Sequence, residues 1–112
     1  MNPGPVYHSS VSAGRWHAQS LAEQMGNIGS EVSRALRWQT KDQITFQNAL
    51  ARLLELMDLT ITDPRWRKNR ELTRTREVLC DFLVGDNTYH SDPQSLQEYF
   101  DQFARVTRQK AG

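Results

Sequence analysis

The stretch NALARLLELMDLTI, residues 48–61, is the most apolar part of this chain. Together with Phe46, its large apolar side chains recur every three or four residues, which is the spacing of one face of an α-helix. Ala49, Leu56 and Leu59 widen that face beyond a narrow stripe. A helix with so wide an apolar surface needs partners on several sides. We therefore expect it to be the central helix of an all-α bundle.

Length and composition favour a single globular domain. The chain has 112 residues, of which 38% are hydrophobic and 24% are charged, as in ordinary globular proteins. It contains no run of about 18 apolar residues, so we expect no membrane span. The first residues have neither the basic nor the apolar region of a secretory signal, which predicts a cytoplasmic protein. Its one cysteine, Cys80, agrees with a reducing compartment.

The segment before the central helix predicts another helix, from about Trp16 to Trp38. Its apolar residues follow helical spacing, and Ser20 with Glu23 has the spacing of a capping box, although the helix could begin a turn earlier. Residues 37–43 contain no Gly or Pro, but a turn is needed there to avoid one very long helix. Thr40 with Gln43 also has capping-box spacing, so we predict that the second helix starts near Lys41.

Two Asp-Pro pairs mark the starts of the remaining helices. Aspartate is a good N-cap, and proline is tolerated at the first helical position. We predict a third helix from Pro64 to about Val84, ended by Gly85, and a fourth helix from Pro93. The inner face of the fourth helix would carry Leu96, Tyr99, Phe100, Phe103 and Val106.

Four helices with short connections predict a four-helix, up-and-down antiparallel bundle. We assign this bundle to residues 15–112. Residues 1–14 are rich in Pro, Gly and Ser and are predicted to form a flexible tail.

Small residues form a second stripe on the first predicted helix, namely Ala22, Gly26, Gly29 and Ser33. Each glycine inside a helix costs roughly 1 kcal/mol relative to alanine, so a close contact should offset this cost. The contact would be a neighbouring helix of the same chain, the same helix of a second subunit in a homodimer, or a ligand.

The third predicted helix carries most of the positive charge. Residues 65–82 contain six Arg or Lys against three Asp or Glu, although the net charge of the whole chain is only +1. On one continuous helix, Arg67, Arg70 and Arg74 would share an exposed face near Trp66. Guanidinium groups bind phosphates and carboxylates, so this face is a candidate site for an anion or a nucleic acid.

The alternative is a solvated face. Glu71 and Glu77 lie three or four residues after two of these arginines and could pair with them. Arg76 points toward the margin of the core, where Glu31 or Asp58 could pair with it. A buried or half-buried cluster of this kind would fix the helix register, and reversing the charge of Arg76 would then destabilise the fold severely.

The loop after the third helix contains Asp86, Asn87, Tyr89 and His90. These side chains combine hydrogen-bonding and aromatic groups and are a candidate site. Asp and Asn after a glycine are also ordinary turn residues, which is the interpretation that we favour.

The residue types of known catalytic and metal sites do not form a recognisable pattern. His8, His17 and His90 are scattered, and none lies in the Glu-x-x-His arrangement of di-iron bundles. The sequence has no Gly-x-Ser-x-Gly motif and no phosphate-binding loop. Cys80 lies within the third helix and is interpreted as an inert, packed thiol. We therefore predict no metal and no cofactor.

The four-helix plan, with its compact Ala/Leu-rich second helix, resembles the HEPN group of small prokaryotic bundles. The phrases NIGSEVSRAL, LELMDLTITDP, REVLCDFL and DNTYHSD resemble those of small bacterial proteins of uncharacterised function. The HEPN resemblance implies a dimer that acts with a nucleotidyltransferase partner or serves as a ribonuclease toxin. Catalytic HEPN proteins carry an Arg followed four to six residues later by His, and no histidine here has such an arginine, so no catalytic residue is carried over.

These patterns predict a non-catalytic binding or interaction module, accessory to a partner protein or binding an anion through the arginine face. The alternative is a HEPN-type ribonuclease or nucleotide-processing enzyme, with a site such as Arg74, Asp86, Tyr89 and His90.

Overall fold

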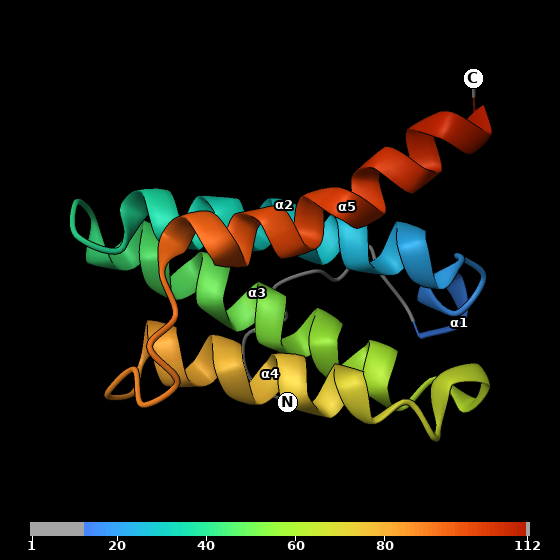
Figure 1. Cartoon of the computed structure of the whole chain (residues 1–112), viewed down its shortest axis with the longest axis horizontal. Coiled ribbons are helices and arrows are strands. Elements are labelled where there is room, and N and C mark those ends of the chain that lie inside the picture. Colours follow the sequence, from blue (N-terminus) through green and yellow to red (C-terminus); the bar gives the residue numbers. More distant parts are fainter. Residues whose placement is uncertain (1–12, 112) are drawn as a thin grey trace, which may run out of the picture.

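The structure, a computed structural model, describes residues 13–111, and their side chains as far as residue 108. Every element in that range is helical, which confirms the predicted all-α class (Figure 1). The helices are α1 (Ala13–Trp16), α2 (Leu21–Trp38), α3 (Gln43–Ile61), the 3₁₀ turn η1 (Pro64–Trp66), α4 (Arg70–Leu83) and α5 (Pro93–Ala111). Of the predicted tail, residues 1–12 lie outside the described residues, and residues 13 and 14 belong to α1.

Helix α3 is central, as its apolar sequence indicates. Leu53 and Met57 are fully buried, and the helix packs against α2 on one side and α4 on another. Helix α2 also packs against α5, and the four longer helices reverse direction from one to the next (Figure 1). Helices α4 and α5 are thus each packed on a different member of the α2–α3 pair. None of the described helices is long and apolar enough to cross a membrane.

Helix α2 begins at Leu21 and not at Trp16. The predicted capping box is formed: the Glu23 amide donates to Ser20 Oγ at 3.1 Å, and the Ser20 amide donates to Glu23 Oε1 at 2.8 Å. Ser20 itself has an extended backbone, which separates α2 from the single turn of α1. The predicted start is therefore wrong, because a residue that caps a helix is itself outside that helix.

Helix α3 begins at Gln43, two residues after the predicted start. Asp42, and not Thr40, is its N-cap. The Asp42 carboxylate accepts hydrogen bonds from the amides of Ile44 and Thr45. A carboxylate at this position also complements the positive end of the helix dipole.

The third predicted helix is interrupted, which is the largest error of the sequence analysis. Asp63 caps only the 3₁₀ turn of η1, and Asn69 then caps α4 by accepting from the Glu71 amide. Arg65 and Trp66 of η1 are held by hydrogen bonds to Gln19 and Gln24, so the chain does not continue as one α-helix. Helix α4 ends just before Gly85, whose amide donates to the Cys80 carbonyl.

Helix α5 begins at Pro93, as predicted, with the Asp92 carboxylate accepting from the Ser95 amide at 2.8 Å. Leu96 and Phe100 are buried in the core. Val106 is 40% exposed, so its predicted place on the inner face is wrong. The last turns of α5 project beyond the other helices (Figure 1).

The two glycines of the small-residue stripe lie beneath α5. A Cβ atom at Gly29 would come within 2.7 Å of Phe100 Cβ, and one at Gly26 would lie 3.8 Å from the Ala104 backbone. The close contact therefore involves a neighbouring helix of the same chain. Ala22 and Ser33, the ends of the stripe, are half-buried.

Candidate functional site

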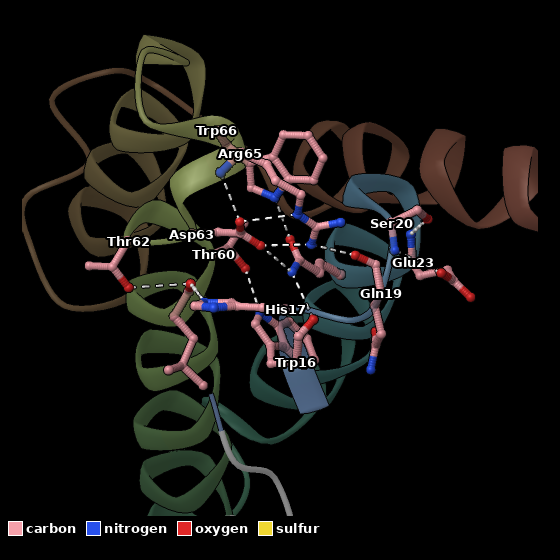
Figure 2. A network of polar contacts seen from close by, with 12 residues as sticks. Trp16, His17, Gln19, Ser20, Glu23, Thr60, Thr62, Asp63, Arg65 and Trp66 are labelled. Atoms are coloured by element: carbon pink, nitrogen blue, oxygen red, sulfur yellow. Dashed lines mark hydrogen bonds and ion pairs between the residues drawn. The ribbon is translucent and has the colours of Figure 1, made fainter. Parts of the chain in front are cut away.

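Two features of the structure are candidates for a site: a buried polar network and an open groove. The network lies where α1, α2, the end of α3 and η1 meet (Figure 2). In its first part, the Trp16 indole Nε1 donates to Thr60 Oγ1 at 2.9 Å, and the Thr60 hydroxyl donates to the Leu56 carbonyl at 2.9 Å. Beside them, His17 Nε2 donates to the Leu59 carbonyl at 3.0 Å. These bonds hold α1 against the end of α3.

The second part of the network surrounds Asp63, whose residue surface is only 1% exposed. Its carboxylate accepts from Arg65 through Nη2 at 2.7 Å, Nε at 3.1 Å and the backbone amide at 3.0 Å. The Gln24 amide donates to the same carboxylate at 3.2 Å. These hydrogen bonds, led by the Arg65 guanidinium, hold the pKa of Asp63 well below its ordinary value, although burial opposes them. The carboxylate therefore stays ionised and is a poor proton donor.

Gln24 and Trp66 complete the network. The Gln24 Nε2 group also donates to the Trp16 carbonyl at 2.9 Å, and its Oε1 accepts from Trp66 Nε1 at 2.8 Å. The Arg65 guanidinium lies 4.4 Å from the centre of the Trp66 ring and donates to the Gln19 carbonyl. Because its buried polar groups satisfy one another, we interpret the network as a structural anchor and not as a reactive site.

The groove lies between α4 and α5 and has a volume of about 420 Å³. Its apolar lining is Val78, Leu79, Leu96 and Phe100, and its polar lining is Glu71, Arg74, Thr75, Ser91, Ser95 and Tyr99. Small-molecule sites are typically apolar hollows of this size range with a few polar groups at defined places. The groove therefore has the size and the lining of a small-molecule site.

Tyr99 orders one side of the groove. Its hydroxyl donates to the Glu71 carboxylate, and Thr75 Oγ1 lies 3.2 Å from the same hydroxyl oxygen. Burial and the Glu71 carboxylate raise the pKa of Tyr99 to about 12, so the phenol keeps its proton at neutral pH. Its ring packs edge-on against Phe100 and Phe103, at centroid distances of 5.2 and 5.5 Å. These contacts fix the ring beside the groove.

Arg74 is the cationic member of this lining. The alternative prediction, that Glu71 and Glu77 pair with arginines of the same helix, is wrong. Glu71 bonds to Tyr99 instead, and Glu77 accepts a hydrogen bond from the Tyr89 hydroxyl at 3.4 Å. Within the described part of the chain, Arg74 has no hydrogen bond or ion pair, and its side chain is exposed. A guanidinium group thus borders the groove with its donors available.

The other residues of the predicted arginine face lie elsewhere. Arg70 is the first residue of α4, but Arg67 follows η1 outside any α-helix, and both are exposed. Trp66 is half-buried and bonded to Gln24. The single helix surface on which that prediction depended does not exist, because the chain breaks between η1 and α4.

The candidate residues of the loop after α4 mainly stabilise the conformation of that loop. Asn87 and His90 have positive φ angles of 53° and 55°, and the Asn87 side chain bonds twice to the backbone of Ser91. The Asp81 carboxylate accepts hydrogen bonds from the Tyr89 and Thr88 amides, which lower its pKa. Asp86, the remaining candidate, is exposed. Among the described residues, no hydrogen bond or ion pair joins any two of Arg74, Asp86, Tyr89 and His90.

Arg76 pairs with Asp58, one of its two predicted partners, at 2.8 Å. The side chains are 36% and 58% exposed, so the pair lies largely at the surface, whereas the sequence predicted a buried or half-buried cluster. Glu31 pairs instead with Arg52 at 3.0 Å and leaves its Oε1 buried without a partner.

The described residues contain no group of three His, Cys, Asp or Glu side chains that could hold a metal ion. Cys80 is half-buried, with Arg76 Nη1 at 3.7 Å from its sulfur.

No protein-family model, no curated protein and no solved structure matches this chain. The resemblance to HEPN proteins therefore stays a prediction.

Gln24, Arg65 and the pairing of Glu71 with Tyr99 were not predicted from the sequence. A signal was present for Gln24, because it lies on the inner face of its helix, four residues before Ile28. Arg65 and the Glu71–Tyr99 bond depend on contacts between segments far apart in the sequence, for which spacing gives no signal.

Proposed function

We propose that this chain is a non-catalytic binding module, built on a four-helix up-and-down bundle, that holds a ligand in the α4–α5 groove. The observation that carries the proposal is an apolar groove of about 420 Å³ with the unpaired guanidinium of Arg74 at its edge. Apolar lining supplies affinity, and the few polar groups fix orientation.

The proposal replaces the arginine face of the sequence analysis with a narrower site. Of those arginines, only Arg74 lines the groove, and the aromatic group beside it is Tyr99 and not Trp66. The scaffold supports the groove from behind, because Leu79 and Phe100 belong to both the groove lining and the buried core.

The test uses anilinonaphthalene sulfonate, an apolar fluorophore with one negative charge, whose emission rises in an apolar site. Replacing Ser95 by Trp places an indole in the groove, whereas Thr73→Trp adds the same group on the exposed side of α4. We expect saturable, one-to-one binding to the wild type and to Thr73→Trp, and none to Ser95→Trp. Circular dichroism and melting curves establish that all three proteins are folded.

Two results would refute the proposed function. One is the absence of saturable binding to the folded wild type. The other is equal binding to both tryptophan variants, which would place the fluorophore on another surface. Homodimer formation, a protein partner and cytoplasmic location stay predictions, which sedimentation, co-purification and cell fractionation test.

A further inference from the structure

The polar groups around the α4–α5 groove are not equally available to a ligand. The Tyr99 hydroxyl hydrogen is used by Glu71, and the Thr75 hydroxyl lies 2.7 Å from the Glu71 carbonyl. The Ser95 hydroxyl donates to the Asp92 carbonyl at 3.1 Å. Arg74, in contrast, has no partner among the described residues. The strongest unused donor at the groove is therefore a cation.

The surroundings of Arg74 also favour an anion. Residues 65–76 contain six Arg or Lys and a single acidic residue, Glu71. One oxygen of that carboxylate accepts the Tyr99 hydrogen bond, which disperses part of its negative charge. Arg65 and Arg76 are paired with Asp63 and Asp58, so the further basic groups of this segment are Arg67, Lys68 and Arg70. Their charge predicts a positive potential near Arg74.

The size of the groove favours a small molecule over a partner helix. A helix with its side chains is about 10 Å across and rises about 5.4 Å per turn, so 420 Å³ corresponds to roughly one turn. A docked helix would therefore leave most of its surface outside the groove. A compact molecule, in contrast, can cover the lining of Val78, Leu79, Leu96 and Phe100.

We propose that the ligand of the groove is a small carboxylic acid with an apolar body, bound with its carboxylate at Arg74 and its hydrocarbon part over the apolar lining. This inference rests on the proposed function and specifies the class of ligand. Guanidinium and carboxylate form charge-assisted hydrogen bonds, and the apolar part gains by leaving water.

The test compares three probes with the same ten-carbon chain: decanoate, decanol and decyltrimethylammonium. Each is titrated by calorimetry into the wild type, Arg74→Gln and Arg70→Gln, with decanol below its solubility limit and the two ionic probes below their micelle concentrations. The last variant removes the same charge from the same helix at a residue that does not line the groove. We expect the wild type to bind decanoate about fivefold more tightly than decanol, the size of effect expected for an exposed ion pair.

In Arg74→Gln the preference for decanoate over decanol should disappear, because this variant should lose more affinity for decanoate than for decanol. Arg70→Gln should keep most of the preference. Because Arg74 is exposed, raising the salt concentration should also reduce the preference in the wild type.

Several results would overturn this assignment. Equal affinity for the three probes, or tighter binding of the cation, would show that the groove does not select acids. A preference that survives Arg74→Gln, or that falls equally in Arg70→Gln, would remove Arg74 as its cause. Absence of decanoate binding, with the fluorophore still bound, would refute the small acid and favour side chains of a partner protein, whereas absence of both would refute the proposed function itself.

Discussion

Replacing Gly29 by Ala tests how closely α2 and α5 are packed. An alanine Cβ there would lie 2.7 Å from Phe100 Cβ and 3.4 Å from its Cγ. Cβ atoms in proteins essentially never come as close as 2.7 Å to another heavy atom. Because Phe100 Cβ is bonded directly to the backbone, it cannot move away without that backbone. Helix α5 would therefore have to shift.

Two opposing effects set the magnitude. Alanine gains about 1 kcal/mol over glycine inside a helix, and overpacking a core costs about 1–3 kcal/mol. We expect Gly29→Ala to lower the free energy of unfolding by about 1 kcal/mol, which lowers the melting temperature by about 4–8 °C in a domain of this size.

Gly26 provides the matched control on the same helix. Its Cβ would meet the Ala104 backbone at 3.8 Å, an ordinary contact, so Gly26→Ala should raise the free energy of unfolding by up to about 1 kcal/mol. Thermal and urea unfolding measure both variants. If Gly29→Ala proved as stable as Gly26→Ala, the close packing of α5 on α2 would be wrong. Because Phe100 also lines the groove, Gly29→Ala alone should weaken fluorophore binding.

Three further predictions concern charged groups. The pKa of Asp63 is lowered in the folded protein, so the ionised carboxylate stabilises the fold above pH 3.8, its ordinary pKa, and this stabilisation is lost as the pH falls below 3.8. Asp63→Asn should therefore make the free energy of unfolding less dependent on pH in the acid range. An unchanged dependence would contradict the hydrogen-bond network around Asp63. Arg76→Glu should cost only about 1 kcal/mol in urea unfolding, because its pair with Asp58 is exposed, and failure to fold would show a larger role. Arg52→Met leaves the half-buried Glu31 without its ion pair and should lower the free energy of unfolding by about 1–3 kcal/mol. Adding Glu31→Leu to this variant should restore most of the lost stability in thermal melts.

The helices themselves were largely predictable from the sequence. The apolar period found α3, and the Asp-Pro pair found the start of α5, because both signals are local. The Asp63-Pro64 pair also predicted the start of an α-helix, but only a 3₁₀ turn begins there. The contacts of Arg65 and Trp66 with residues 19–24 decide the conformation of this segment. Asn69 gave a second capping signal, which was available in the sequence but was overlooked.

The groove was not predictable in the same way. Periodicity placed Leu96 and Phe100 on the inner face of the fourth helix, but it gives no information on how far α4 stands from α5. That spacing follows from packing α4 on α3 and α5 on α2. The predicted arginine face failed because it assumed one straight helix, whereas the chain breaks before α4, and of the three arginines only Arg74 lines the groove.

The most direct test of the binding account is a titration with decanoate followed by methyl NMR. Binding in the groove predicts concentration-dependent shifts of the methyl groups of Val78, Leu79 and Leu96, which line it. The methyl groups of Ile44 and Val84, 76% and 60% exposed on residues outside the groove, should stay unchanged. Shifts centred on Ile44 and Val84, or no shifts at all, would contradict the claim that this protein binds its ligand between α4 and α5.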